Sequence, residues 1–192
     1  MSYLIQLEIK LLKNALSSKI TPTVRPDGKT KFAAVLIVIY GKEPMIIMTK
    51  RPKTMNHHGG EISFPGGTWK QEDDDLLTTA LREAKEEMNL DVSRRQIIGQ
   101  IKPVITLNSG FTIFPFICIL DEIPNLEPNS EIETILHIPL ISLLKTIEDD
   151  FDPSHKSIQE MYTFKHQHHI IWGASARMLK QMCEILSKTG VL

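Results

Sequence analysis

Three glutamates stand close together near the middle of the chain, in the run REAKEE. Glu83, Glu86 and Glu87 are spaced i, i+3 and i+4, so on a helix they share one face. Carboxylates at i and i+4 repel each other by about 0.2–0.5 kcal/mol in an isolated helix, a cost that a bound divalent cation would offset. Carboxylate oxygens suit Mg²⁺ or Mn²⁺ and leave coordination positions open for phosphate and water. Taken alone, this run is more typical of an ordinary solvated helix face, and a metal site is the alternative that the surrounding residues must support.

The helix that must position these glutamates is predicted from residue 73 to residue 88. Its apolar side is formed by residues at helical spacing, namely Leu77, Ala80, Leu81, Ala84 and Met88. Three residues are N-cap candidates that also place negative charge at the positive end of the helix dipole: Asp73, Asp74 and Asp75. Asn89 follows the helix and tolerates the left-handed conformation of a C-cap. Arg82 can pair with Glu86 across one turn, which would restrain one carboxylate.

A pair of glycines precedes this helix. Gly66 and Gly67 belong to the segment FPGG, and glycines let a backbone approach a ligand or metal closely. The whole stretch resembles the Nudix box, G-x5-E-x7-R-E-U-x-E-E-x-G-U, in which U is a bulky apolar residue. The residues that match in order are Gly67, Arg82, Glu83, Ala84, Glu86, Glu87 and Leu90. The departures are one extra residue between Gly67 and Arg82, Asp73 or Glu72 at the first glutamate, Asn89 at the second glycine, and the small Ala84.

The resemblance implies an α/β fold, the Nudix-type α/β/α sandwich in which helices flank a mixed sheet. It also implies a metal-dependent diphosphatase, an enzyme in which water attacks a phosphorus of a diphosphate linked to another group. The cofactor implied is Mg²⁺ or Mn²⁺. Its ligands would be Glu83 and Glu87, completed by Glu86 and the carbonyl oxygen of Gly66.

Further site residues are expected outside the three glutamates. The resemblance places Arg82 in the catalytic set, and Gly67 is expected to contact the substrate. The box does not fix the catalytic base, although a glutamate from a later loop often helps in this fold. In the segment PNSEIETILHIPL, Glu131 fits the family pattern better than Glu133. The alternative for Glu131 is a carboxylate on a surface loop.

The extra residue in the box also occurs in the coenzyme A pyrophosphatase branch, whose upstream signature is L-L-T-x-R-S-x3-R-x3-G-x3-F-P-G-G. Thr49, Arg51, Gly60 and FPGG match it at the same spacing, and IIWGASARML resembles the closing WG-x-T-A of the branch. This implies hydrolysis of coenzyme A or acyl-coenzyme A to 3′,5′-ADP and 4′-phosphopantetheine. Arg51 and His58 are then candidates for substrate binding, with a structural ion pair as the alternative for Arg51.

Asn56 stands where the signature has its second arginine, and Pro52 where it has serine. An amide is a poor substitute for the planar guanidinium that binds phosphate at two points. A diphosphatase of ADP-ribose, dinucleotides or nucleoside triphosphates is therefore a second hypothesis. A third hypothesis is a non-catalytic module that binds a nucleotide for regulation. The intact glutamates Glu83, Glu86 and Glu87 argue against it.

The rest of the chain is predicted to form one domain over residues 1–192 that begins with an amphipathic helix. Apolar, β-branched runs predict strands at Phe32–Tyr40, Met45–Thr49, Ile97–Ile105, Thr112–Leu120 and Tyr162–Ile171. Residues 135–144 are expected to form a short strand that runs into a short helix, and residues 172–187 a final amphipathic helix. This order predicts a sheet with helices on both faces.

Composition narrows the classes of partner. The 192 residues carry a net charge of −1, which gives no reason to expect nucleic acid or an anionic membrane surface. The N-terminal segment lacks the basic start and unbroken apolar stretch of a signal peptide, and no run approaches the length of a membrane span, so we expect neither. Cys118 and Cys183 are predicted to be separate core thiols, which favours a reducing, cytoplasmic location. The expected partner is a small-molecule nucleotide, and a homodimer is an assembly that the sequence leaves open.

Two groups of side chains have competing interpretations. His166 and His168 would share one face of a strand, and with His169 they could suggest a metal site, but solvated histidines are the preferred reading. Phe111, Phe114 and Trp172 could stack on an adenine, whereas aromatic core residues are the commoner outcome.

Overall fold

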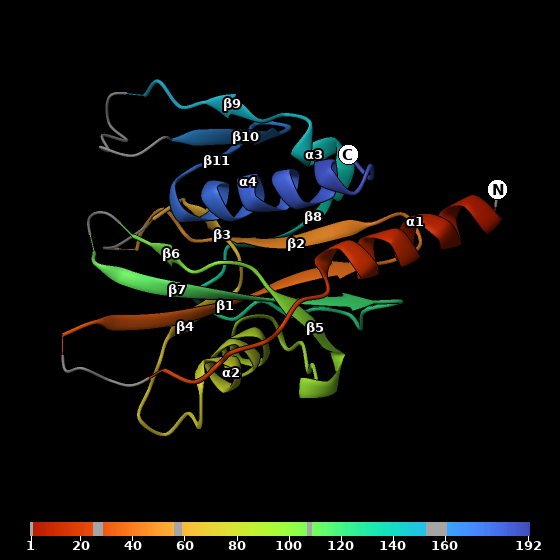
Figure 1. The fold of residues 1–192 in the computed structure, drawn as a ribbon. Helices are drawn as coiled ribbons and strands as arrows, with labels where there is room; N and C mark the ends of the chain where they lie inside the picture. The colour runs from red at the N-terminus through yellow and green to blue at the C-terminus, as the bar shows by residue number, and fades with distance from the viewer. Residues whose placement is uncertain (1, 25–28, 56–58, 107–108, 153–160) are drawn as a thin grey trace.

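The structure, a computed structural model, describes residues 2–24, 29–55, 59–106, 109–152 and 161–192. Its centre is a mixed sheet with helices on both faces (Figure 1). The main path through the sheet runs in the order β3 (Ile62–Ser63), β2 (Met45–Lys50), β1 (Lys31–Tyr40), β7 (Phe111–Leu120) and β5 (Ile97–Gln100). Three strands join beside it, namely β4 (Gly66–Thr68) on β1, β6 (Val104–Ile105) on β7 and β8 (Thr134–Pro139) on β2. The predicted fold class is confirmed.

Strand β1 lies at the centre of the sheet, and both of its faces are therefore buried. It pairs in parallel with β7 from Lys31 opposite Phe111 to Tyr40 opposite Leu120, and antiparallel with β2. Ala34, Leu36 and Val38 pack into one hydrophobic cluster, and the residues between them, Val35, Ile37 and Ile39, pack into the other. Successive side chains of a strand point to opposite faces, so one continuous apolar run supplies two cores.

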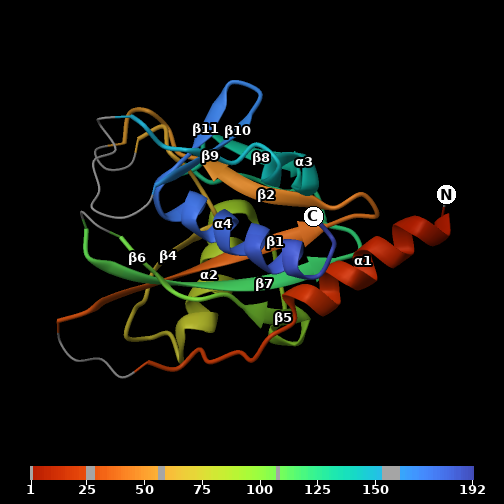
Figure 2. The same ribbon diagram turned by 45° about the horizontal axis from the view of Figure 1, so that its top comes forward.

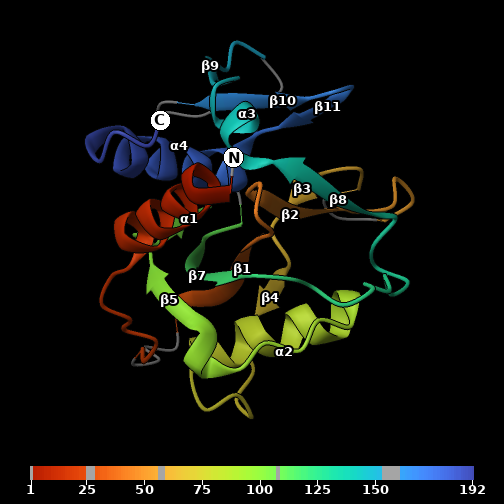
Figure 3. The same ribbon diagram turned by 90° about the vertical axis from the view of Figure 1, so that its right-hand side faces the viewer.

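The helices form a layer on each side of the sheet. Helix α2 (Leu76–Met88) covers one face, whereas α1 (Ser2–Leu16) and α4 (Gly173–Lys188) lie against the other (Figure 3). A second sheet of β9 (Glu148–Asp149), β10 (Tyr162–His166) and β11 (His169–Ile171) lies beyond α4 (Figures 1 and 2). Two short helices, η1 (Arg94–Gln96) and α3 (Leu140–Leu144), complete the described elements. None of the helices in the described ranges is long and apolar enough to cross a membrane.

Two predicted strands are wrong as continuous elements. Residues 97–105 form β5 and β6 with a break between them, since Pro103 has no amide hydrogen to donate to the sheet. Residues 162–171 form the hairpin of β10 and β11, which turns at Gln167 with a φ of 54°. His166 therefore pairs with His169 across the hairpin, and it does not share a strand face with His168.

Candidate functional site

The caps of helix α2 fix the ends of the helix that carries Glu83, Glu86 and Glu87, which together form its acidic face. Asp75 is the N-cap, and its side chain accepts a hydrogen bond from the backbone N–H of Thr78 at 2.8 Å. Asn89 ends the helix in the left-handed conformation with a φ of 55°, as predicted from its type. Between the caps, Ala80 and Ala84 are fully buried against the sheet. The helix cannot rotate without exposing this apolar side, so its acidic face is held in one orientation.

Arg82 forms ion pairs with two carboxylates of the acidic face. Its Nη1 donates to Glu83 Oε1 at 2.6 Å and to Glu86 Oε2 at 3.0 Å, which confirms the predicted pair with Glu86. The same guanidinium donates through Nε and Nη2 to the two oxygens of Asp73 at 2.9 and 3.1 Å. Asp73, and not Glu72, is thus the residue that contacts the arginine of the box. Arg82 holds two of the three predicted metal ligands in place.

Asp73 is nearly buried, with 6% of its surface exposed. Burial alone would raise the pKa of its carboxyl, but hydrogen bonds from Arg82, the backbone of Lys70 and Thr79 hold the pKa below its usual value. The pair with Asp73 in turn raises the pKa of Arg82. Both groups are therefore charged at neutral pH, and their ion pair anchors the loop before α2 to the acidic face.

Glu87 lies on the inner edge of this face and is 3% exposed. Its Oε2 accepts a hydrogen bond from the backbone N–H of Gly66 at 3.0 Å, and its Oε1 lies 3.6 Å from Arg51 Nη2. Burial raises the pKa of Glu87 to about 7, and the nearby carboxylates of Glu83 and Glu131 add to the rise, although Gly66 and Arg51 oppose it. The carboxylates of Glu83, Glu86, Glu87 and Glu131 also outnumber the guanidiniums of Arg51 and Arg82 that contact them.

The two glycines of FPGG are required because the backbone of β4 runs between β1 and α2. A Cβ on Gly66 would lie 2.3 Å from the carbonyl oxygen of Ala34, and a Cβ on Gly67 would lie 2.6 Å from the carboxyl carbon of Glu83. Real Cβ atoms essentially never come within 3.0 Å of another heavy atom. The absence of side chains thus brings the backbone of Gly66 and Gly67 against the carboxylates of Glu83 and Glu87.

The fit of these residues to a divalent cation can be judged from their donors. Glu83, Glu86, Glu87 and the Gly66 carbonyl offer only oxygen, the ligand that Mg²⁺ and Mn²⁺ prefer. Within the described ranges, no three His, Cys, Asp or Glu side chains already converge as a ligand group, and the carboxylates of Glu83 and Glu86 contact Arg82. The oxygen donors and the surplus negative charge fit the cation, and the assignment of these ligands stays a prediction.

The structure separates the two candidates for the catalytic base. Glu131 Oε2 lies 3.4 Å from Nη1 of Arg51, the same guanidinium that approaches Glu87. Glu133 instead pairs with Lys50 at 2.8 Å. The structure therefore brings Glu131 to the acidic face and directs Glu133 to a neighbouring cation.

One residue that helps to place Glu131 was missed from the sequence. Asn129 donates its backbone N–H to the carbonyl of Glu87 at 2.9 Å, and its side-chain oxygen accepts from the N–H of Glu131, also at 2.9 Å. These bonds tie the loop to the end of α2. Asn129 lies in a loop whose partner is distant in sequence, so the only signal was its ability to form such turns.

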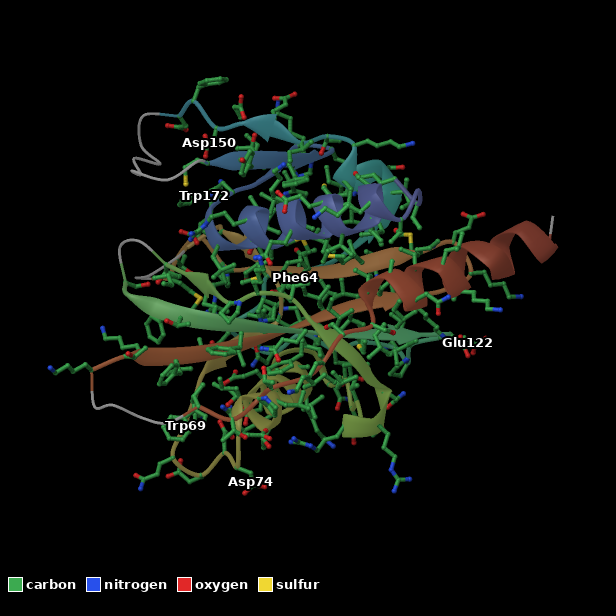
Figure 4. All side chains as sticks on the ribbon, in the orientation of Figure 1. Phe64, Trp69, Asp74, Glu122, Asp150 and Trp172 are labelled. Carbon is green, nitrogen blue, oxygen red and sulfur yellow. The ribbon has the colours of Figure 1, made fainter. Side chains whose placement is uncertain are left out.

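A cavity of about 370 Å³ adjoins the glycine pair. Arg51, Gly66 and Gly67 form part of its wall, and the other walls are largely apolar, with Val35, Ile62, Phe64, Ile113 and Met178. Phe111 and Trp172 also line it, so the preferred prediction that they are core residues is wrong for these two. Phe114 packs edge-on against Phe32, with ring centroids 6.2 Å apart, at the opposite core. Figure 4 shows Phe64 between the sheet and α4, and Trp172 where α4 begins.

His58 of the predicted site lies outside the described residues, as does Asn56, which stands in place of the signature arginine. The remaining predicted site residues lie together: Arg51, Gly66, Gly67, Arg82, Glu83, Glu86, Glu87 and Glu131 are linked by the contacts given above. They come from the end of β2, from β4, from α2 and from the loop before β8. These residues are far apart in the sequence, and the fold of the sheet brings them together.

Comparison with known proteins gives the family. The model of the NUDIX domain matches residues 30–160. The Nudix hydrolase NudL of Photorhabdus laumondii is 32% identical over 167 residues, which cover 85% of this chain and 89% of that protein.

Solved structures share the fold. A MutT/nudix family protein from Enterococcus faecalis superposes with a TM-score of 0.58 at 12% identity, over 88% of this chain and 66% of that longer one. The NUDIX domain of Shewanella oneidensis NrtR, in a complex with ADP ribose, gives a TM-score of 0.51 at 15% identity, over 64% of this chain and 82% of that one. With the family model matching most of its length, the chain belongs to the Nudix family of hydrolases.

Proposed function

We propose that this Nudix pyrophosphohydrolase cleaves the diphosphate of coenzyme A or an acyl-coenzyme A to 3′,5′-ADP and the 4′-phosphopantetheine. One observation carries the proposal: Arg51 and FPGG, which belong to the coenzyme A signature, meet at the cavity beside Glu87. The signature segment and the Nudix box thus serve one site. The apolar walls suit the uncharged parts of such a substrate, and Trp172 and Phe111 offer aromatic surface for an adenine.

Nudix hydrolases generally use divalent metal ions, and Mg²⁺ or Mn²⁺ is the cofactor proposed here. Glu83, Glu86, Glu87 and the carbonyl of Gly66 would hold it. When bound, the cation supplies charge neutralisation for the phosphates and lowers the pKa of water. The buried carboxylate of Glu87 needs such a positive charge, because burial and its acidic neighbours oppose its ionisation.

The remaining residues have separate roles in the proposal. Water attacks one phosphorus of the diphosphate, the bond from that phosphorus to the bridging oxygen breaks, and the oxygen leaves with the other phosphate. Glu131 takes the proton of the attacking water on its carboxylate. Arg51 contacts the phosphate. By pairing with both Glu87 and Glu131, it also holds the metal-binding carboxylate and the proton-accepting carboxylate close to each other.

A substrate panel tests this proposal directly. The protein is incubated with Mg²⁺ or Mn²⁺ and with coenzyme A, acetyl-coenzyme A, ADP-ribose, a dinucleotide and a nucleoside triphosphate, and the products are identified by mass spectrometry. We expect 3′,5′-ADP from the two coenzyme A species. Cleavage of ADP-ribose with no turnover of any coenzyme A species would overturn the substrate assignment and support the second hypothesis.

Glu87→Gln tests the metal site. The variant should lose hydrolysis and also the increase in melting temperature that Mg²⁺ or Mn²⁺ gives the wild type. Glu122→Gln is the matched control, because Glu122 is exposed and lies at the far end of the sheet (Figure 4). Unchanged turnover in Glu87→Gln would remove Glu87 from the site.

The location of the protein is part of the same proposal. Cys118 and Cys183 are both free and buried, as predicted. Burial raises the pKa of the Cys118 thiol to about 12, so this thiol is not reactive at neutral pH. Free thiols of this kind support a reducing compartment such as the cytoplasm.

A further inference from the structure

The last turn of α2 is attached to the loop that precedes β8. The final carbonyl groups of an α-helix have no partner within the helix. Here the carbonyl oxygen of Glu87 accepts a hydrogen bond from the N–H of Asn129 at 2.9 Å. The carbonyl oxygen of Met88 accepts one from the N–H of Glu127 at 3.1 Å. Pro128 lies between the two donors and has no N–H of its own to satisfy. The loop is therefore fastened to the end of the helix that carries the acidic face.

Asn129 extends this attachment to Glu131. Its side-chain oxygen accepts a hydrogen bond from the N–H of Glu131 at 2.9 Å, and its carbonyl oxygen accepts one from the N–H of Ile132 at 3.2 Å. An asparagine that accepts from the second residue after it closes a tight turn. Ile132 is 4% exposed, so the far side of this turn is anchored in the interior. The backbone of Glu131 is thus held on both sides.

The side chain of Glu131 is less restrained than its backbone. It is 55% exposed, and its oxygen lies 3.4 Å from Nη1 of Arg51, longer than a strong hydrogen bond. An exposed ion pair of this length restrains a carboxylate only weakly. The direction in which Glu131 points therefore depends chiefly on the turn that Asn129 closes.

We infer that Asn129 is a positioning residue of the hydrolysis, which sets the carboxylate of Glu131 relative to Glu87. The inference rests on the proposed function, in which Glu87 would bind the cation and Glu131 would take the proton of the attacking water. Glu87 then acts through two groups. Its carboxylate meets Gly66 and Arg51, and its backbone carbonyl holds the loop that carries the base. A shift of this end of α2 would move both carboxylates together, so their separation would be kept.

Asn129→Ala tests the inference, because it removes the side-chain acceptor and keeps the backbone bond to Glu87. We expect kcat for coenzyme A to fall about 10-fold with little change in KM, since a small misplacement of a catalytic group costs up to about 100-fold. Asn129→Asp keeps an acceptor oxygen at the same place and should restore most of kcat. Asn125→Ala is the matched control, because Asn125 is exposed in the same loop, and its kcat should equal that of the wild type.

A double-mutant cycle shows whether the effect passes through Glu131. In a Glu131→Gln background, Asn129→Ala should lower kcat no further. An equal further loss in that background would overturn the inference, as would an unchanged kcat in Asn129→Ala when Glu131→Gln is impaired. Amide hydrogen exchange in the metal-free protein gives a second measurement that needs no turnover. The N–H of Glu131 should exchange faster in Asn129→Ala than in the wild type, and equal rates would also overturn the inference.

Failure of the proposed function is recognised separately. If ADP-ribose is cleaved and coenzyme A is not, the substrate assignment fails, and the same cycle measured with ADP-ribose supports or overturns the role of Asn129. If Glu131→Gln alone keeps full kcat, the assignment of the base fails and this inference fails with it. Should Asn129→Ala not fold, Asn129→Ser takes its place in the cycle, because a serine hydroxyl closes the same turn more weakly.

Discussion

Arg82 and Asp73 form a two-point ion pair, in which Nε of the guanidinium donates to one carboxylate oxygen at 2.9 Å and Nη2 to the other at 3.1 Å. The pair joins the loop before α2 to the face that carries Glu83 and Glu86. It is largely shielded from water, since the side chain of Asp73 is 4% exposed and that of Arg82 is 21% exposed. Its loss should therefore affect both stability and activity.

Asp73→Asn should lower the free energy of unfolding by about 2 kcal/mol, because a buried, charge-assisted pair is broken while Arg82 remains. Activity should fall as well, since Arg82 also holds Glu83 and Glu86. Urea unfolding and steady-state kinetics measure the two effects. Asp74→Asn is the control, because Asp74 is exposed and points away from the body of the protein (Figure 4). Equal stability of the two variants would show that the ion pair contributes nothing.

The two glycines of FPGG should respond differently to alanine. Gly66→Ala places a methyl group 2.3 Å from a backbone oxygen of β1, so we expect marked loss of stability or failure to fold. For Gly67→Ala the three nearest atoms all belong to the carboxylate of Glu83, the far end of a side chain, so the fold should survive while hydrolysis falls. Thermal melting and turnover distinguish the two. If Gly67→Ala kept full activity, the position of the Glu83 carboxylate would not matter for catalysis.

Glu131→Gln and Glu133→Gln form a matched pair, since the two residues are two positions apart and pair with different cations. Glu131→Gln should lower kcat by about 100-fold or more, the contribution of a positioned general base, with little change in KM. Glu133→Gln should leave kcat unchanged because Glu133 pairs with Lys50. The opposite order of effects would transfer the role of base to Glu133.

The pair of Asp75 and Arg94 predicts how stability depends on pH. Hydrogen bonds from Arg94 and Thr78 keep the pKa of Asp75 below its usual value of 3.8, even though burial opposes this. A lowered pKa in the folded state stabilises the protein above pH 3.8, and this stabilisation is lost as the pH falls through the folded value. Asp75→Asn keeps an N-cap of similar strength and removes the charge, so it should cost about 0.5–1 kcal/mol at pH 7, since Arg94 is half-exposed.

This difference between wild type and Asp75→Asn should be constant from pH 7 to pH 5 and should shrink below pH 3.8. Urea unfolding over that range measures it, with the exposed Glu122→Gln as a control that shows no difference at any pH. A difference that stays the same at low pH would mean that the ion pair is not its source.

The sequence by itself determined the features that depend on neighbours along the chain. The helix from the N-cap region to Asn89, the shared face of Glu83, Glu86 and Glu87, and the pair of Arg82 and Glu86 follow from helical spacing and cap preferences. The buried run of β1 follows from continuous apolar residues. Together with the glycine pair, these local patterns were enough to predict the family and the acidic face.

Only the tertiary structure decided choices between residues of equal local character. Asp73 rather than Glu72 meets Arg82, and Glu131 rather than Glu133 meets Arg51, because loops distant in sequence are set by hydrogen bonds that no local pattern encodes. The hairpin at Gln167 was missed since its residues carry no glycine or proline signal. The sequence did not predict that the start of α4, with Ser175 and Arg177, lines the cavity. Periodicity shows which side of a helix is buried, but not which cavity its first turn faces.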